Sequence, residues 1–219
     1  MELQHEQILE RLTWLTDKGG PVIVVIAILS VLTLTLFIAK LMHFWRLGMF
    51  GLNRADSAIT AWERNETLKA RDAVSAMTGC VPGTVLAAMS GALRHGEDRA
   101  LIEAETTRVA RGFLNAAHGG FRLFELIITA APLLGLLGTV LGMIEAFRRI
   151  EDDSSRVDPG VLAGGIWEAL LTTAAGMIVA LIALAALNIL EAIVERARHA
   201  LEDNATRVLN GPASLMAAA

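Results

Sequence analysis

Four polar residues in apolar surroundings are the ones in this chain that could do chemistry: Thr139, Glu168, Thr172 and Thr173. A carboxylate such as that of Glu168, placed near an aqueous entrance, can attract cations and exchange protons. Hydroxyl groups can line such a path but cannot themselves hold charge near neutral pH. Plainer interpretations also exist, because Glu168 could be an ordinary interfacial carboxylate and the threonines could bond only to their own helix.

The elements that would position these residues are three long stretches without charged residues, at 19–39, 126–144 and 169–190. A hydrocarbon core about 30 Å thick needs roughly 20 helical residues, so each stretch is long enough to cross it. Three uninterrupted buried core helices would be unusual in so short a soluble chain. We therefore predict an all-α integral membrane protein with transmembrane helices over residues 19–39, 126–147 and 166–190.

The threonines of the last two predicted spans lie at matching depths. Thr139 comes about two helical turns before Phe147, and Thr173 about two turns after Ile166. Because these spans run antiparallel, both threonines should lie roughly 10–12 Å below the outer membrane surface. This match favours a shared polar lining formed by Thr139, Thr172, Thr173 and Glu168.

Small residues on the same two spans favour close helix packing. In lipid, glycine and alanine let helix backbones approach one another. Gly138 and Gly142 form a GxxxG pair, and Ala169, Thr173 and Gly176 lie on one face of the third span. The residues expected to pack the helices are Pro132, Gly135, Gly138, Gly142 and Gly176.

The charge-free stretches contain no Asp, Glu, Lys, Arg or His. A protein that moves protons needs a titratable group within the membrane, and a hydroxyl cannot serve as one. We therefore expect a partner protein to supply that group.

The distribution of basic residues predicts the orientation in the membrane. More than half of the 19 Lys and Arg residues lie between residues 40 and 125, and cytoplasmic segments carry such an excess. The loop 40–125 and the C-terminal helix and tail 191–219 should therefore face the cytoplasm. Residues 1–18, a tail or an amphipathic helix too acidic for a cleaved signal peptide, and the connection 148–165 should lie outside.

The cytoplasmic loop is predicted to be helical. Short helices are expected at residues 56–64, 66–77 and 82–94, followed by one helix from Glu97 to Phe147 that bends at Gly119-Gly120. The third span should continue inward as far as Gly211, so two long helices should join the loop helices in a bundle. Cys80 is the single cysteine, which excludes an intrachain disulfide and indicates an inert residue.

Two motifs resemble the span signatures of the MotA/TolQ/ExbB proton-channel family. Residues 131–147 read APLLGLLGTVLGMIEAF and residues 165–176 read GIWEALLTTAAG. The resemblance implies a homopentamer in the inner membrane of a Gram-negative bacterium, with a periplasmic N-terminus. It also implies a central pore that holds a single-span partner dimer of the ExbD or TolR type, whose membrane aspartate faces Thr139 and Thr173.

The resemblance further implies that the proton motive force drives movement passed to a TonB- or TolA-type protein. The motifs suit ExbB and TolQ about equally, with a slight preference for ExbB and TonB-dependent transport across the outer membrane. A non-conducting membrane scaffold is the alternative from another class. No cofactor is expected beyond protons as the coupling ion, and the lack of a nucleotide loop, a metal cluster or a nucleophile–base pair disfavours an enzyme.

Overall fold

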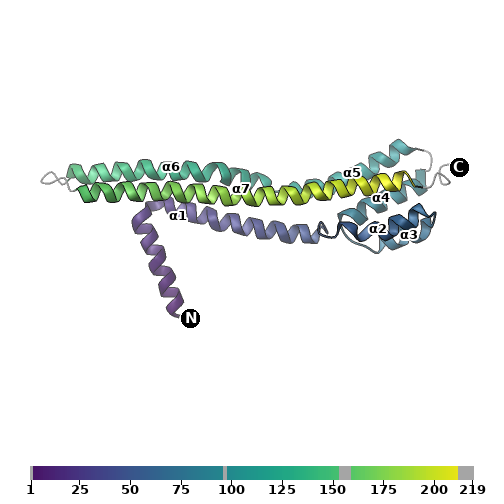
Figure 1. The fold of residues 1–219 in the computed structure, drawn as a ribbon, viewed down its shortest axis with the longest axis horizontal. Coiled ribbons are helices and arrows are strands. Elements are labelled where there is room, and N and C mark those ends of the chain that lie inside the picture. The colour runs from purple at the N-terminus through teal and green to yellow at the C-terminus, as the bar shows by residue number, and fades with distance from the viewer. Residues whose placement is uncertain (1, 96–97, 153–158, 212–219) are drawn as a thin grey trace. The chain divides into compact units, whose positions relative to one another are not determined.

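The computed structural model describes residues 2–95, 98–152 and 159–211, which are almost entirely helical (Figure 1). The helices are α1 (Glu2–Arg46), η1 (Leu52–Ala55), α2 (Asp56–Glu63), α3 (Thr67–Ser75), α4 (Cys80–His95), α5 (Arg99–His118), α6 (Phe121–Asp152) and α7 (Pro159–Leu209). Three helical stretches are long and apolar enough to cross a membrane: Gly20–Arg46, Arg99–Glu151 and Leu162–Leu209. The predicted all-α fold with three long apolar helices is therefore confirmed.

The chain divides into two compact units. The first unit contains Met1–Phe37 and Gly120–Leu187, and the second contains Ile38–Gly119 and Asn188–Ala219. Helices α1 and α7 each contribute residues to both units. The first unit holds most of the apolar span residues and the second holds the loop helices.

The first unit has a small core where α1, α6 and α7 meet, and an apolar exterior. Its buried core consists of Val22, Ile26, Ile127, Ala131, Val179, Ala180 and Ala183. Helices α6 and α7 run side by side in this unit (Figure 1). The exposed side chains include Leu133, Leu136, Leu170, Ile178 and Leu181. Large apolar side chains that point outward on a long helix are suited to lipid rather than to water.

Two breaks in the helices follow from glycine. Gly20 has φ 59° and ψ −170°, which interrupts α1 immediately before Pro21. Gly120 has φ 87°, in the left-handed region that glycine tolerates, and it separates α5 from α6. The single helix predicted from Glu97 to Phe147 is thus two helices, and the expected bend at Gly119-Gly120 is a break.

Helices α6 and α7 extend further toward each other than the predicted spans. Helix α6 continues to Asp152, supported by an ion pair between Arg149 and Glu145 at 3.1 Å, and α7 begins at Pro159. Proline suits the first position of a helix because its missing N–H would have no partner there. Much of the predicted connection 148–165 is therefore helical, and its middle, 153–158, lies outside the described residues.

The second unit is a helical bundle joined to the end of α7. The Trp62 side chain of α2 is buried, and its indole N–H donates a hydrogen bond to the Val208 carbonyl at 3.0 Å. Arg207 of α7 forms ion pairs with Glu63 at 3.0 Å and with Asp56 at 3.5 Å. These contacts attach the first loop helix to the last turns of the chain.

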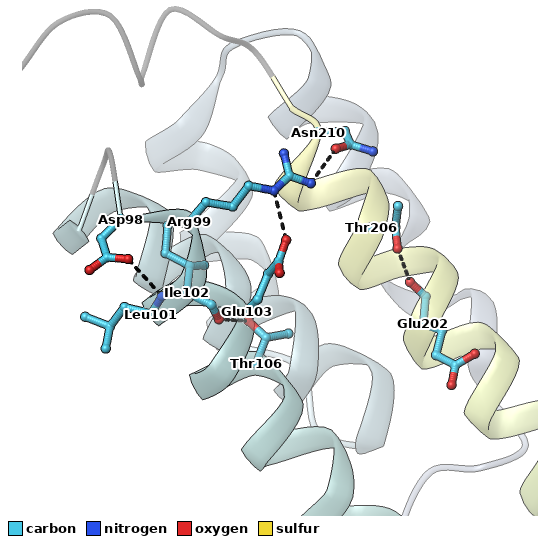
Figure 2. A network of polar contacts seen from close by, with 9 residues as sticks. All are labelled: Asp98, Arg99, Leu101, Ile102, Glu103, Thr106, Glu202, Thr206 and Asn210. Atoms are coloured by element: carbon cyan, nitrogen blue, oxygen red, sulfur yellow. Dashed lines mark hydrogen bonds and ion pairs between the residues drawn. The ribbon is translucent and has the colours of Figure 1, made fainter.

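A second polar contact joins α5 to the end of α7 (Figure 2). The Arg99 guanidinium donates to the Asn210 amide oxygen at 3.0 Å and to the Glu103 carboxylate at 2.8 Å. Asp98 caps α5 by accepting a hydrogen bond from the Leu101 N–H.

The single cysteine, Cys80, is buried at the start of α4. Burial raises the pKa of its thiol, as expected of an unreactive cysteine.

The buried indole generates a prediction about stability. Trp62→Phe keeps an aromatic ring but removes one of the two donors to the Val208 carbonyl, which still accepts from the Gly211 N–H, so the free energy of unfolding should fall by about 0.5–1.5 kcal/mol. Trp167→Phe is the control, because Trp167 is 68% exposed. Thermal unfolding of the two purified variants in detergent measures the difference, and equal melting temperatures would contradict the role assigned to this hydrogen bond.

Candidate functional site

The candidate site begins with the close approach of α6 and α7. A Cβ added at Gly135 would lie 2.9 Å from the Thr173 Cα and 3.0 Å from the Thr172 carbonyl oxygen. A Cβ added at Gly176 would collide with the Ala131 carbonyl oxygen and lie 3.3 Å from the Gly135 Cα. Because such distances leave no room for a side chain, the two backbones touch here only where glycine is present.

The close approach continues along both helices. A Cβ at Gly138 would collide with the Thr172 side chain, and one at Gly142 would lie 3.0 Å from the Ala169 Cβ. Further along, a Cβ at Gly165 would lie 2.6 Å from the Ala146 Cβ. We call this contact the α6–α7 seam. It consists of Ala131, Gly135, Gly138, Gly142 and Ala146 on α6, and Gly165, Ala169, Thr172, Thr173 and Gly176 on α7.

Two threonines of α7 donate hydrogen bonds across the seam. The Thr173 hydroxyl donates to the Gly135 carbonyl at 3.0 Å. The Thr172 hydroxyl lies 2.7 Å from the Ala169 carbonyl of its own helix and 3.3 Å from the same Gly135 carbonyl. Bonds of this kind between membrane helices contribute about 0.6 kcal/mol on average, so their main effect is to fix the register of the two helices.

Thr139 behaves differently from the α7 threonines. Its hydroxyl donates to the Leu136 carbonyl of its own helix at 2.7 Å, and its side chain is half-buried. Thr33 of α1 also bonds to its own helix, through the Leu29 carbonyl at 2.7 Å. Within a single chain the Thr139 and Thr173 hydroxyls therefore donate to different carbonyls, and the predicted shared polar lining stays a prediction. Thr173 reaches Gly135, one turn from Thr139.

The remaining predicted residues lie on the same two helices. Glu168 is half-buried and precedes the seam residue Ala169, one turn from Thr172. Pro132 is half-buried inside α6, next to Ala131. The first unit therefore gathers the predicted lining and packing residues on one helix pair.

Sequence reasoning missed several seam residues. Ala131, Ala146 and Gly165 pack in the seam, and Val22 of α1 would lie 3.2 Å from a Cβ at Gly138. Ala146 could have been found from the sequence, because it continues the four-residue spacing of Gly138 and Gly142. The contact of Val22 had no comparable signal, since nothing in a uniformly apolar span shows which side chain faces a neighbour.

The site has the character of a polar strip inside an apolar helix pair. The part of the chain that the structure describes contains no group of three or more His, Cys, Asp or Glu side chains that could hold a metal ion. The polar atoms available at the seam are hydroxyls and one carboxylate. Such groups can bind and pass protons, but they do not form a nucleophile with its base.

Comparison with protein families identifies the region that contains the site. The model of the MotA/TolQ/ExbB proton channel family matches residues 74–203, which include α4, α5, α6 and most of α7. Both motifs that define the seam lie inside this match.

Curated relatives carry biopolymer-transport names. The chain is 44% identical over 85 residues to "Biopolymer transport protein exbB1" of Vibrio cholerae, covering 39% of this chain and 37% of that protein. It is 33% identical over 175 residues to "Putative biopolymer transport protein ExbB-like 1" of Synechocystis, covering 79% of this chain and 68% of that one. With "Biopolymer transport protein ExbB" of Pseudomonas putida, the identity is 29% over 197 residues, covering 86% and 58% of the two chains. The matched region thus spans little more than a third of the Vibrio protein and just over half of the Pseudomonas protein.

The seam generates a prediction about packing. Gly138→Ala places a methyl group against Thr172 and should destabilise the helix pair by about 1–3 kcal/mol through overpacking. Gly164→Ala is the control on α7, because a Cβ there would meet nothing within 4 Å. The measurement is the melting temperature of each variant in detergent. A Gly138→Ala protein as stable as Gly164→Ala would show that the seam is looser than described.

Proposed function

Because the chain belongs to the MotA/TolQ/ExbB proton channel family, we propose that it is the ExbB-type subunit of a proton-driven motor for transport across the outer membrane. It is a multi-pass membrane protein of a channel family and not an enzyme. The single observation that carries the proposal is the α6–α7 seam, where hydroxyls lie within the charge-free stretches 126–144 and 169–190 and one carboxylate, Glu168, lies next to the second stretch. The ExbB names of the relatives favour an ExbB-type role over a TolQ-type one.

The assembly proposed is a homopentamer around a partner dimer of the ExbD or TolR type. The charge-free stretches have no group that can hold a proton in the membrane, so the partner's single span supplies a carboxylate. Thr139 and Thr173 face that carboxylate, with Thr172 beside them and Glu168 at the entrance. Movement of the assembly is passed to a TonB-type protein, with the N-terminus in the periplasm and the C-terminus in the cytoplasm of a Gram-negative cell.

The hydrogen bonds of the threonines suggest how they act. The hydroxyl hydrogens of Thr139 and Thr173 are donated to the carbonyls of Leu136 and Gly135. A hydroxyl whose hydrogen is already donated offers only lone pairs to a further partner. It therefore accepts a hydrogen bond from a protonated carboxylic acid but gives none to a carboxylate. In this arrangement the threonines favour the neutral form of the partner's acid as it moves past them.

The energy available is sufficient for work on another protein. Each proton that crosses gains about 2.3 kcal/mol per 100 mV of membrane potential. Glu168 is placed one turn from Thr172, where it can collect protons before they reach the partner's acid. Helix α7 continues without interruption from the span unit into the loop unit, so movement of the spans can reach the loop helices along it.

Proton flux tests the proposal. Thr139→Val removes a hydroxyl whose only described bond is to its own helix, so it should cut proton flux by at least about tenfold without changing the pentamer. Thr139→Ser keeps the hydroxyl and should conduct normally. The measurement is acidification of liposomes that contain the chain and its ExbD-type partner, with particle mass as the check on assembly.

A matched set of variants separates pore lining from packing. Thr33→Val removes a buried hydroxyl that also bonds to its own helix, but on α1, and should leave flux unchanged. Thr173→Val removes both a lining hydroxyl and the hydrogen bond to the Gly135 carbonyl. Thr173→Ser keeps the hydroxyl and is therefore the control for that variant. Wild-type flux in Thr139→Val would refute the lining assignment. Absence of flux in the wild-type complex would favour a non-conducting scaffold.

A further inference from the structure

A groove in the second unit is not used by the seam or by the contacts of the bundle. It has a volume of about 590 Å³ and lies between the turn after α1 and the start of the α7 extension. Its walls include Met49, Phe50, Leu52 and Asn53 from the turn, and Ile193 and Arg196 from α7. The groove therefore combines an apolar floor with one cation and one amide.

Arg196 stands apart from the other arginines near the end of α7. Arg198 forms ion pairs with Glu195 at 3.8 Å and Glu202 at 3.0 Å, and Arg207 forms ion pairs with two carboxylates of α2. Among the described residues, no ion pair or hydrogen bond involves the Arg196 side chain. Since Glu195 is already engaged by Arg198 and His199, the positive charge in the groove is not neutralised by its neighbours.

The position of Arg196 along α7 matches the depth of lipid headgroups. The charge-free stretch of the third span ends at Leu190, so Arg196 follows it by roughly 9 Å along the helix. The headgroup layer is about 5–8 Å thick on each side, and a long arginine side chain can reach back toward it. A guanidinium at this level meets phosphates rather than acyl chains.

Two exposed aromatic residues lie near the end of α1 and in the turn after it. Trp45 is 75% exposed near the end of that helix, and Phe50 is 57% exposed in the wall of the groove. Aromatic side chains collect where the membrane meets water. The apolar wall made by Phe50, Leu52 and Ile193 can hold the upper part of an acyl chain while Arg196 and Asn53 face its phosphate.

We propose that this groove binds the headgroup of one anionic phospholipid, held by Arg196 and Asn53 with its acyl chains against Phe50 and Ile193. Basic pockets between membrane helices bind such headgroups through charge and hydrogen bonding together. The site is separate from the proton pathway, and it rests on membership of a membrane-protein family rather than on conduction. It ties the turn after α1 to α7 through a lipid.

The test compares lipid retention by three full-length variants. The purified protein is incubated with phosphatidylglycerol or phosphatidylcholine and analysed by native mass spectrometry. Arg196→Gln should lower retention of phosphatidylglycerol by about fivefold, while Arg196→Lys keeps most of it because the charge remains. Arg198→Gln is the matched control, two residues away with the same loss of charge, and should retain the lipid as the wild type does.

Several outcomes would overturn the proposal. Equal retention of phosphatidylglycerol by the wild type and Arg196→Gln would remove the arginine from the site, and equal retention of phosphatidylcholine would remove its preference for charge. Displacement of the lipid by millimolar inorganic phosphate would indicate a site for free anions. A changed particle mass in Arg196→Gln, with lipid retention intact, would identify the groove as a contact between copies of the chain.

Discussion

The rest of the span region depends on how closely the backbones of α6 and α7 approach each other. Where two helices touch through Gly135, Gly138, Gly142 and Gly176, only small side chains such as those of Thr172 and Ala169 fit in the contact, and backbone carbonyls become accessible to the neighbouring helix. In lipid this approach has no hydrophobic driving force behind it, because acyl chains are as apolar as leucine. Close packing and hydrogen bonds must therefore hold the pair together, and small residues are the condition for both.

The Gly135 carbonyl belongs both to the close packing of the two helices and to the polar contacts of the threonines. It accepts the Thr173 hydroxyl from α7 at 3.0 Å, and in a regular helix it also accepts the N–H of Thr139. The Thr173 hydroxyl and the Thr139 backbone N–H thus share one acceptor, the Gly135 carbonyl, and the two threonine hydroxyls do not bond to each other. A shift of α7 along α6 would break this arrangement, so the register of the seam also sets the register of the polar strip. This gives a physical reason for glycine and threonine to lie within a turn of each other on these helices.

The two units are stabilised in different ways. The span unit has a small core and points leucine and isoleucine outward, whereas the loop unit buries Trp62 and Phe44 and uses ion pairs such as that of Arg207 with Glu63. Water competes with polar contacts in the loop unit and is absent around the spans. Within the loop unit, Arg196 lines the proposed lipid groove, and the exposed Trp45 lies near the end of α1, so this unit also carries the residue types that lipid headgroups attract.

The sequence alone determined the helical class and the number of long apolar helices, because bilayer thickness and helix rise fix how many uncharged residues a span needs. The family was indicated by the resemblance of two motifs, at residues 131–147 and 165–176, and the family comparison confirms it. The absence of titratable residues from the charge-free stretches is the basis for proposing a partner that supplies a carboxylate. Only the tertiary structure decided that α5 and α6 separate at Gly120, that Val22 closes the seam, and that Thr173 bonds to Gly135 while Thr139 bonds to its own helix. These outcomes depend on the rotation of each helix about its axis, which a uniformly apolar span leaves undetermined until its neighbour is packed against it.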